Sequence, residues 1–299
     1  MVGQNFLEHP ASKHHQMIAP SRNDLNLLDR AAVRRFIQDE KPDVIIHAAG
    51  RVGGIQANMA KPVEFLRDNL DMGLNVITSA ASVGIRDLIN LASSCMYPRH
   101  ASNPLAEELI LTGQLEPTNE GYALAKIVST RLCEYISQEH ADKNYKTLIP
   151  CNLYGRFDKF DPTHSHLIPA VIRKIHEAKQ AGDRVVDVWG DGEARREFML
   201  AKDFAGFVFF ALENLKALPQ NLNVGLGHDY TITEYYEEIA SVVGFEGSFS
   251  YDLTKPVGMR QKLVDIEKLS LLGWRHTTNL ADGVRESYEF FKEGIKNEL

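Results

Sequence analysis

Short continuous apolar runs alternate in this chain with longer segments in which apolar residues recur every three or four positions. The runs predict strands at 16–19 (a weak one), 43–49, 87–92 and 146–151, of which 43–49 and 87–92 are expected to be buried on both faces. The longer segments predict helices at 1–8, 31–38, 63–83 and 122–139. Strands and helices alternating at this spacing indicate parallel βαβ units with right-handed crossovers.

The second half of the chain keeps the alternation with less regularity. It predicts helices at 166–179, 203–215, 231–243 and 280–292 and strands at 185–189 and 221–225. Residues 255–265 are expected to form a loop. No repeat and no low-complexity segment interrupts the pattern, so we expect an α/β protein.

Composition narrows the class of protein. A net charge of -7 over 299 residues, without any Lys/Arg run, argues against a nucleic-acid partner. No apolar run is long enough for a membrane span, and no signal-peptide layout is present at the N-terminus. The three cysteines, Cys95, Cys133 and Cys151, are odd in number and lack zinc spacing. We therefore expect reduced thiols, no metal site and a cytoplasmic enzyme.

Tyr122 and Lys126 form the first candidate site for chemistry. Four residues apart on a helix, they share one face, so the ammonium can lie near the phenol. A phenol normally loses its proton near pH 10, and a neighbouring cation is expected to lower that pKa. Tyr122 would then serve as a proton donor or acceptor; the alternative is an ordinary surface pair.

Polar side chains follow the ends of two predicted strands. Ser93 and Cys95 come after the strand at 87–92, and Asn152 follows the strand at 146–151. Ligands of parallel sheets bind beyond the carboxyl ends of the strands. The alternatives for Ser93 and Cys95 are a backbone-capping hydroxyl and a small core residue. We expect Cys133 and Cys151 to serve packing, although Cys151 can also line a cofactor cleft.

Nine stretches together resemble one known family. They are 22–29 (RNDLNLLD), 52–55 (VGGI), 93–98 (SSCMYP), 115–120 (LEPTNE), 122–126 (YALAK), 152–155 (NLYG), 165–170 (SHLIPA), 196–198 (REF) and 262–265 (KLVD). In this order they resemble the extended short-chain dehydrogenase/reductases that act on nucleotide sugars, and within them the GDP-L-fucose synthases. The first-listed motif lies near the N-terminus and the last near the C-terminus, so nearly the whole chain takes part.

The resemblance implies a doubly wound (Rossmann) parallel sheet with a smaller C-terminal α/β substrate domain. Residues 1–155, rejoined by about 198–226, would bind NADP, and 156–299 would mainly bind substrate. It also implies a homodimer.

The resemblance further implies two reactions at one site. GDP-4-keto-6-deoxy-D-mannose would be epimerised at carbons 3 and 5 and reduced by NADPH at carbon 4. Cys95 and His166 would act as base and acid in the epimerisation, since a thiol near cations titrates closer to neutrality. Tyr122 would protonate the forming alkoxide, Lys126 would hold the nicotinamide ribose, and Ser93 would hydrogen-bond the substrate oxygen.

The resemblance also assigns residues to the two ligands. An Arg in the turn at Ser21-Arg22 favours the 2′-phosphate of NADP over NAD, unless it is a plain surface residue. Those implied for NADP are Gly3, Arg22, Asn23, Asp24, Leu25, Asn26, Leu27, Leu91, Ala92, Ser93, Ser94, Lys126, Pro150, Cys151, Asn152, Leu153 and His166. Those implied for the GDP-sugar are Lys174, Trp189, Arg196 and Lys262. Trp189 can instead be a core residue, and Arg195 can compete with Arg196 for the diphosphate.

The chain departs from the family at its start. Met1-Val2-Gly3 matches only the tail of the GxxGxxG turn, so the family's first strand and two of three glycines are missing. We expect that strand to belong between the strands at Met17 and Leu88. Either Met1 is an internal methionine of a longer protein, or the short form binds NADPH poorly.

Two other functions remain open at this point. One is a sister enzyme that makes a related GDP-deoxysugar such as GDP-colitose with the same acid and base. The other is a catalytically impaired paralogue that binds sugar nucleotides. The five catalytic candidates favour an enzyme, whereas the missing glycines favour the impaired protein.

Overall fold

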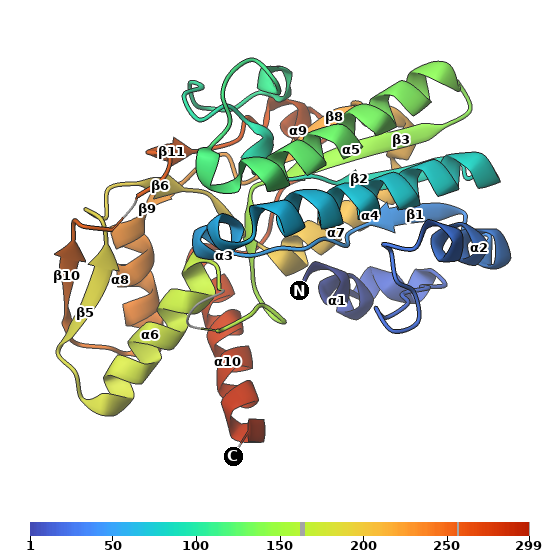
Figure 1. The fold of residues 1–299 in the computed structure, drawn as a ribbon. Helices are drawn as coiled ribbons and strands as arrows, with labels where there is room; N and C mark the ends of the chain where they lie inside the picture. The colour runs from blue at the N-terminus through green and yellow to red at the C-terminus, as the bar shows by residue number, and fades with distance from the viewer. Residues whose placement is uncertain (162–164, 256, 299) are drawn as a thin grey trace.

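A four-stranded parallel sheet forms the centre of the larger half of the molecule (Figure 1). The computed structural model describes residues 1–161, 165–255 and 257–298. The strands run in the order β1 (Val44–His47), β2 (Asp87–Leu91), β3 (Asn144–Pro150) and β8 (Asn221–Val224). Helices α4 (Pro62–Val83) and α5 (Glu120–Glu139) pack together over one face. Helices α1 (Val2–Glu8) and α7 (Ala201–Glu213) pack together on the other, so the prediction of a doubly wound parallel sheet is confirmed.

The prediction of a strand at 16–19 is wrong. These residues are irregular, and β1 is the outer strand of the sheet among the residues described. A strand requires a neighbour for its ladder of backbone hydrogen bonds, and none of the described segments pairs with 16–19. The strand at Leu88 (β2) lies between β1 and β3 among the described residues, and the expected place of the absent strand stays a prediction. As an edge strand, β1 is mostly half-buried at 44–46 rather than buried on both faces.

The remaining long helices and β5 lie close to the predicted ranges. They are α2 (Arg30–Glu40), α6 (Leu167–Ala181), β5 (Val185–Trp189), α8 (Ile232–Val243) and α10 (Leu280–Glu298). Side-chain hydrogen bonds cap the N-termini of two of these helices. At α2 the Asp29 carboxylate accepts from the amides of Ala31 and Ala32, and at α8 Thr231 and Glu234 form a capping box.

Several short elements were not predicted, because their residues show no period of their own. The strands are β4 (Asn152–Tyr154), β6 (Arg195–Arg196), β7 (Phe198–Leu200), β9 (Tyr230–Thr231), β10 (Ser248–Asp252) and β11 (Gln261–Lys262). The helices are α3 (Ile55–Ala60) and α9 (Glu267–Leu271), with 3-10 turns at Pro10–His14, Ser94–Met96, Glu107–Leu109, Pro117–Asn119 and Leu215–Ala217. Strand β11 corrects the prediction of a loop at 255–265, since it pairs in parallel with β6.

A second hydrophobic core lies beside the sheet. Helices α6, α8 and α10 contribute Ile172, Ile239 and Val284, all fully buried, and strand β5 adds Val188. Strand β4 pairs with β7 and carries Tyr154 into this core. None of the described helices is long and apolar enough to cross a membrane.

Gly283 allows α10 to pack against Tyr154. A Cβ atom at this position would lie 2.1 Å from the phenolic oxygen and 3.0 Å from Cζ of Tyr154, a buried ring that cannot turn aside. We predict that Gly283→Ala lowers the free energy of unfolding by about 1–3 kcal/mol, measured by urea denaturation. The control is Gly294→Ala in the same helix, where nothing lies within 4 Å, which gains up to about 1 kcal/mol. Equal effects of the two changes contradict this packing.

Candidate active site

Ser93 and Cys95 lie directly beyond the carboxyl end of β2, as predicted. Ser93 is extended and its Oγ accepts a hydrogen bond of 3.3 Å from the backbone amide of Cys95, which starts the 3-10 turn Ser94–Met96. The Ser93 hydroxyl also lies near enough to the thiol of Cys95 and the phenol of Tyr122 to lower the pKa of each. Ser93 is therefore a neighbour of both groups as well as a backbone cap.

Tyr122 and Lys126 share one face of α5, at the same edge of the sheet. The Lys126 Nζ atom lies 5.8 Å from the centroid of the Tyr122 ring and donates a 2.8 Å hydrogen bond to the carbonyl oxygen of Leu91. Only 7% of the lysine is exposed, so this is not a surface pair. Burial lowers the pKa of Lys126 to about 8, with the nearby Cys95 acting in the opposite direction.

Two of the expected pKa shifts are wrong in this structure. Burial raises the pKa of Tyr122, and the nearby Cys95 adds to the rise, while the hydrogen bond with Ser93 lowers it. Burial likewise raises the pKa of the Cys95 thiol, although Lys262 and Lys126 act to lower it. Loss of water around a buried acid outweighs the attraction of a cation that does not contact it. Both side chains are therefore protonated at neutral pH here.

His166 faces the same region from the start of α6. It is the N-cap residue, but its side chain makes no capping hydrogen bond. Its imidazole interacts electrostatically with Asp158, Lys159 and Lys262, and burial lowers its pKa. Lys262 in turn interacts with Cys95. His166 and Cys95 are thus linked through the one ammonium that both face.

Lys262 and Arg196 form a pair of adjacent cations. They are register partners in the parallel pairing of β11 with β6. Glu116 faces both, and the guanidinium of Arg196 donates to the carbonyl oxygens of Arg195 (2.7 Å) and Val257 (3.2 Å). Like charges side by side on a sheet repel each other, so this arrangement suits an anion between them.

Arg195 and Arg196 are engaged differently. Neighbouring residues of a strand point to opposite faces. The Arg195 guanidinium is held by Asp229, with 2.7 Å from Nε to Oδ1. The contact of Arg195 with the diphosphate, considered as an alternative from the sequence, would require it to leave Asp229 and stays a prediction.

Lys174 and Trp189 lie in the second half of the chain and contact other residues than Arg196 and Lys262 do. The Lys174 ammonium contacts the carbonyl oxygen and the carboxylate of Asp187, at 2.8 and 2.9 Å. Trp189 is 45% exposed and its ring lies 5.5 Å from the ammonium of Lys255, so it is not a core residue. In the part of the chain that the structure describes, neither contacts Cys95, His166 or Tyr122, so the structure does not bring them into that cluster.

The residues predicted to hold the cofactor fall into two groups. Leu91, Ala92 and Ser94 surround the end of β2, and Pro150, Cys151, Asn152 and Leu153 surround the end of β3. The Asn152 side-chain amide donates 2.9 Å to the carbonyl oxygen of Glu197. Cys133 and Cys151 are buried, as expected of packing residues.

The second group belongs to the N-terminal part of the chain, before β1. Arg22, Asn23, Asp24 and Asn26 are exposed, and the carboxylate of Asp24 accepts from the amide (3.0 Å) and hydroxyl (2.6 Å) of Ser21. Leu25 is buried against α2 and α4, and Leu27 accepts 2.9 Å from Asn75. Gly3 is exposed in α1 with no atom near its would-be Cβ.

Sequence reasoning missed four residues at the site. Asp158 and Glu116 face the candidate residues through His166 and Lys262, respectively. Glu197 is fully buried and accepts backbone amides from Val264 and Gly227, each at 3.0 Å. A Cβ at Gly50 would lie 3.8 Å from Nζ of Lys126. Glu116 and Glu197 stood within recognised motifs, and Asp158 follows the NLYG stretch closely, so only their three-dimensional contacts were missing.

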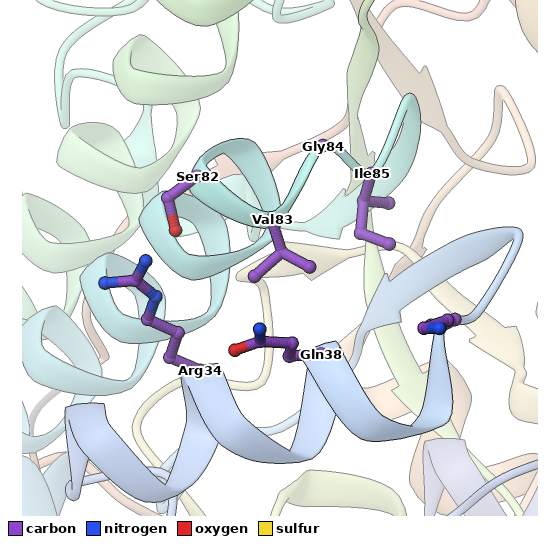
Figure 2. A pocket seen from close by; sticks show the side chains of 7 residues that line it. Arg34, Gln38, Ser82, Val83, Gly84 and Ile85 are labelled. Atoms are coloured by element: carbon purple, nitrogen blue, oxygen red, sulfur yellow. The ribbon is translucent and has the colours of Figure 1, made fainter.

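A separate hollow lies between the ends of α2 and α4 (Figure 2). Its lining includes Arg34, Gln38, Ser82 and Ile85. These residues precede β2, so the hollow lies at the amino end of that strand and contains none of the candidate residues. Among the described part of the chain, no three His, Cys, Asp or Glu side chains gather as a metal site.

Comparison with known proteins gives the family. Residues 1–225 match the model of the NAD dependent epimerase/dehydratase family, and the chain belongs to this family of Rossmann-fold enzymes.

Several relatives are named as enzymes of GDP-sugars. The chain is 53% identical to GDP-L-colitose synthase of Yersinia pseudotuberculosis, covering 100% of this chain and 97% of the relative. It is 51% identical to GDP-L-fucose synthase of Azorhizobium caulinodans, covering 98% and 94%. A solved GDP-mannoheptose C4 reductase from Campylobacter jejuni with NADP bound has a TM-score of 0.87 at 29% identity, covering 97% and 95%.

The buried charge of Lys126 gives a prediction for stability. Its folded-state pKa of about 8 lies below the unfolded value near about 10.4, so the buried charge destabilises the fold at pH 7. The cost fades as pH rises from 8 to 10, because the folded state releases the proton first. We predict that Lys126→Met is more stable than the parent by about 1–3 kcal/mol at pH 7, with a smaller difference at pH 10.

Denaturant titrations at the two pH values measure this difference. The control is Lys292→Met, which removes a partly exposed lysine paired with Glu289 on α10 and changes stability by less than about 1 kcal/mol. The prediction fails if the parent is more stable than Lys126→Met at pH 7 and the difference in free energy of unfolding does not depend on pH.

Proposed function

We propose that this enzyme converts GDP-4-keto-6-deoxy-D-mannose to GDP-L-fucose, by epimerisation at carbons 3 and 5 and NADPH-dependent reduction at carbon 4. One observation supports the proposal: Ser93 neighbours both Cys95 and Tyr122, while Lys262 faces both Cys95 and His166. Candidates for proton transfer to carbon and for reduction therefore meet at one edge of the sheet.

The epimerisation uses Cys95 and His166. A 4-keto group acidifies the protons on carbons 3 and 5, so a modest base removes one and an acid on the opposite face returns another. Burial raises the pKa of the Cys95 thiol and favours its protonated form, whereas the ammonium of Lys262 favours the thiolate. Ser93 donates to the substrate oxygen and stabilises the enolate charge.

The reduction uses Tyr122 and Lys126. NADPH supplies hydride to carbon 4 when bound, and a C4 reductase of similar structure carries NADP. The residues beyond the ends of β1 and β2 fit a cofactor in part. Gly50, after β1, carries no side chain beside the buried Lys126 ammonium, which can donate to a ribose hydroxyl in place of Leu91. Tyr122 then gives its proton to the forming alkoxide. Exposed Arg22 is the candidate for the 2′-phosphate.

The substrate diphosphate is assigned to Arg196 and Lys262. Their register pairing places two positive charges at one point of β6 and β11. Lys174 and Trp189 remain the candidates for the outer part of the GDP group, which requires Lys174 to exchange Asp187 for the ligand. We assign residues 1–155 with about 198–226 to cofactor binding and 156–299 mainly to the substrate. We also assign the enzyme to the cytoplasm.

The second candidate product is GDP-L-colitose, because a GDP-L-colitose synthase is 53% identical. A sister enzyme that makes this product would use the same acid and base residues. Kinetics with both 4-keto substrates decide between the two, and failure with both favours a catalytically impaired sugar-nucleotide-binding protein.

Single substitutions separate the two half-reactions. We predict that Tyr122→Phe lowers the rate of NADPH oxidation by about 10²–10⁴-fold, because the alkoxide loses its proton donor. Cys95→Ala blocks inversion but still permits reduction of the unepimerised ketone. NADPH absorbance and NMR of the product measure both effects. Equal loss of both activities in Cys95→Ala counts against the role assigned to the thiol.

We propose that the protein is a homodimer that pairs through α5. Its outer face exposes Leu124 (38%), Val128 (41%) and Tyr135 (54%), which lie on one side of the helix. We predict that Val128→Glu gives a monomer in sedimentation velocity, because a charge would be buried. The control Val185→Glu alters an exposed valine on β5 and leaves the dimer intact. A monomeric parent, or a dimeric Val128→Glu, refutes this interface.

A further inference from the structure

Glu197 carries a fully buried carboxylate that the proposed proton transfers do not use. It lies in the chain between β6, a strand of the three-stranded sheet β11-β6-β9, and β7. Its backbone carbonyl oxygen accepts hydrogen bonds from the backbone amide (3.2 Å) and the side chain (2.9 Å) of Asn152, at the start of β4. The backbone on either side of this carboxylate is therefore well anchored.

The two carboxylate oxygens of Glu197 hold two different segments of the chain. Oε1 accepts from the amides of Leu226 and Gly227, at 3.0 Å from the latter, in the loop that follows β8. Oε2 accepts 3.0 Å from the amide of Val264, two residues beyond β11. One carboxylate thus joins the end of β11 to the end of β8, a strand of the central sheet.

The surroundings of Glu197 leave its carboxylate no other position. A Cβ atom at Gly225 would lie 2.5 Å from Oε1 of Glu197 and 2.5 Å from Cγ2 of Val264, so these groups are in close contact. Burial raises the pKa of Glu197 to about 7, while the three backbone amides act to lower it. A carboxylate away from water needs such donors, and here all three belong to the two segments that it joins.

The strand held by Glu197 carries one of the two cations assigned to the diphosphate. Lys262 of β11 and Arg196 of β6 are register partners, and like charges side by side repel each other. Arg196 directly precedes Glu197, and Lys262 lies two residues before Val264. Strand β11 is only 2 residues long, so its pairing with β6 supplies few hydrogen bonds. Contacts outside this pairing must keep Lys262 beside Arg196.

Two further contacts hold the end of β11 from another side. Val264 forms a parallel bridge with Leu105, and Oδ1 of Asn103 accepts 2.8 Å from the amide of Leu263. The amide of Val264 is left for Glu197. The link from this stretch to the end of β8 therefore runs through the carboxylate of Glu197.

We propose that Glu197 is a positioning residue that holds β11 in register with β6, so that Lys262 and Arg196 bind the diphosphate of a GDP-sugar together. The part that concerns the ligand rests on the function proposed above, whereas the hold on β11 does not. In Glu197→Gln the amide oxygen can still accept from Leu226 and Gly227, but the amide nitrogen is a donor and cannot accept from Val264. The substitution thus releases β11 and nearly keeps the side-chain volume.

The test compares Glu197→Gln with Glu107→Gln. Glu107 is a matched buried carboxylate that also holds β8, since it accepts 2.8 Å from the amide of Asn223, and it pairs with Lys268 at 2.9 Å. In Glu197→Gln we expect the Kd for GDP, measured by calorimetry, to rise about tenfold or more. Glu107→Gln should change this Kd by less than about twofold, because it touches neither β6 nor β11.

Steady-state kinetics distinguish positioning from a general loss of structure. In Glu197→Gln the KM for GDP-4-keto-6-deoxy-D-mannose should rise about tenfold, while kcat for NADPH oxidation changes by less than about threefold. The reason is that the hydrogen bonds of Glu197 do not reach Tyr122 or Lys126 on α5. A fall in kcat with an unchanged KM contradicts the proposed positioning.

Hydrogen exchange measures the hold on β11 without a ligand. Exchange at the amide of Val264 should be about tenfold faster or more in Glu197→Gln and unchanged in Glu107→Gln. Unchanged exchange in Glu197→Gln, an unchanged Kd for GDP, or equal effects of the two variants overturn the inference. If Glu197→Gln does not fold, the decision rests on Asn103→Ala, which releases the same stretch from another side; an unchanged Kd for GDP there overturns it. The expected exchange in a protein whose parent does not bind GDP supports the hold on β11 and rejects the proposed function instead.

Discussion

The Nζ atom of Lys126 donates to the carbonyl oxygen of Leu91 at the buried end of β2, and the candidate site depends on this bond. It joins α5 to the central sheet at the point where Ser93 and Cys95 emerge. It also keeps an ammonium among groups that exclude water, and this lowers its pKa to about 8. Folding does not require a charge there, since a buried charge costs free energy. A cation held at this cost is more readily explained by chemistry than by stability.

Burial also determines the protonation of the other residues of the site. Burial favours protonated Tyr122 and Cys95 and neutral His166. Lys262 acts against burial at the Cys95 thiol and Asp158 acts against it at the imidazole, whereas at Tyr122 the nearby Cys95 adds to the effect of burial. The thiol and the imidazole therefore each have a neighbouring charge that can shift their protonation. A substrate that binds at Lys262 and Arg196 changes this balance, so the protonation of the substrate-free site is a starting state for the reaction.

Much of the fold could be predicted from the sequence, because long periodic segments such as α4, α5 and α10 carry their own signal. Residues 16–19 could not be placed, since a strand depends on a partner elsewhere in the chain. The placement of Ser93, Cys95, Tyr122, Lys126 and His166 at one edge follows from topology plus motif. Their pKa shifts could not be predicted, because burial and the distance to each charge are properties of the folded chain. For the same reason Asp158 and Glu116 were missed.

We propose that proton transfer at carbons 3 and 5 occurs at the edge of the sheet where hydride is accepted. The decisive measurement is ¹H NMR of GDP-4-keto-6-deoxy-D-mannose in D₂O with the enzyme, in the absence of NADPH. We predict that deuterium replaces the protons at carbons 3 and 5 and that no ketone is reduced. A substrate that keeps both protons, in a preparation that oxidises NADPH once it is added, would contradict it.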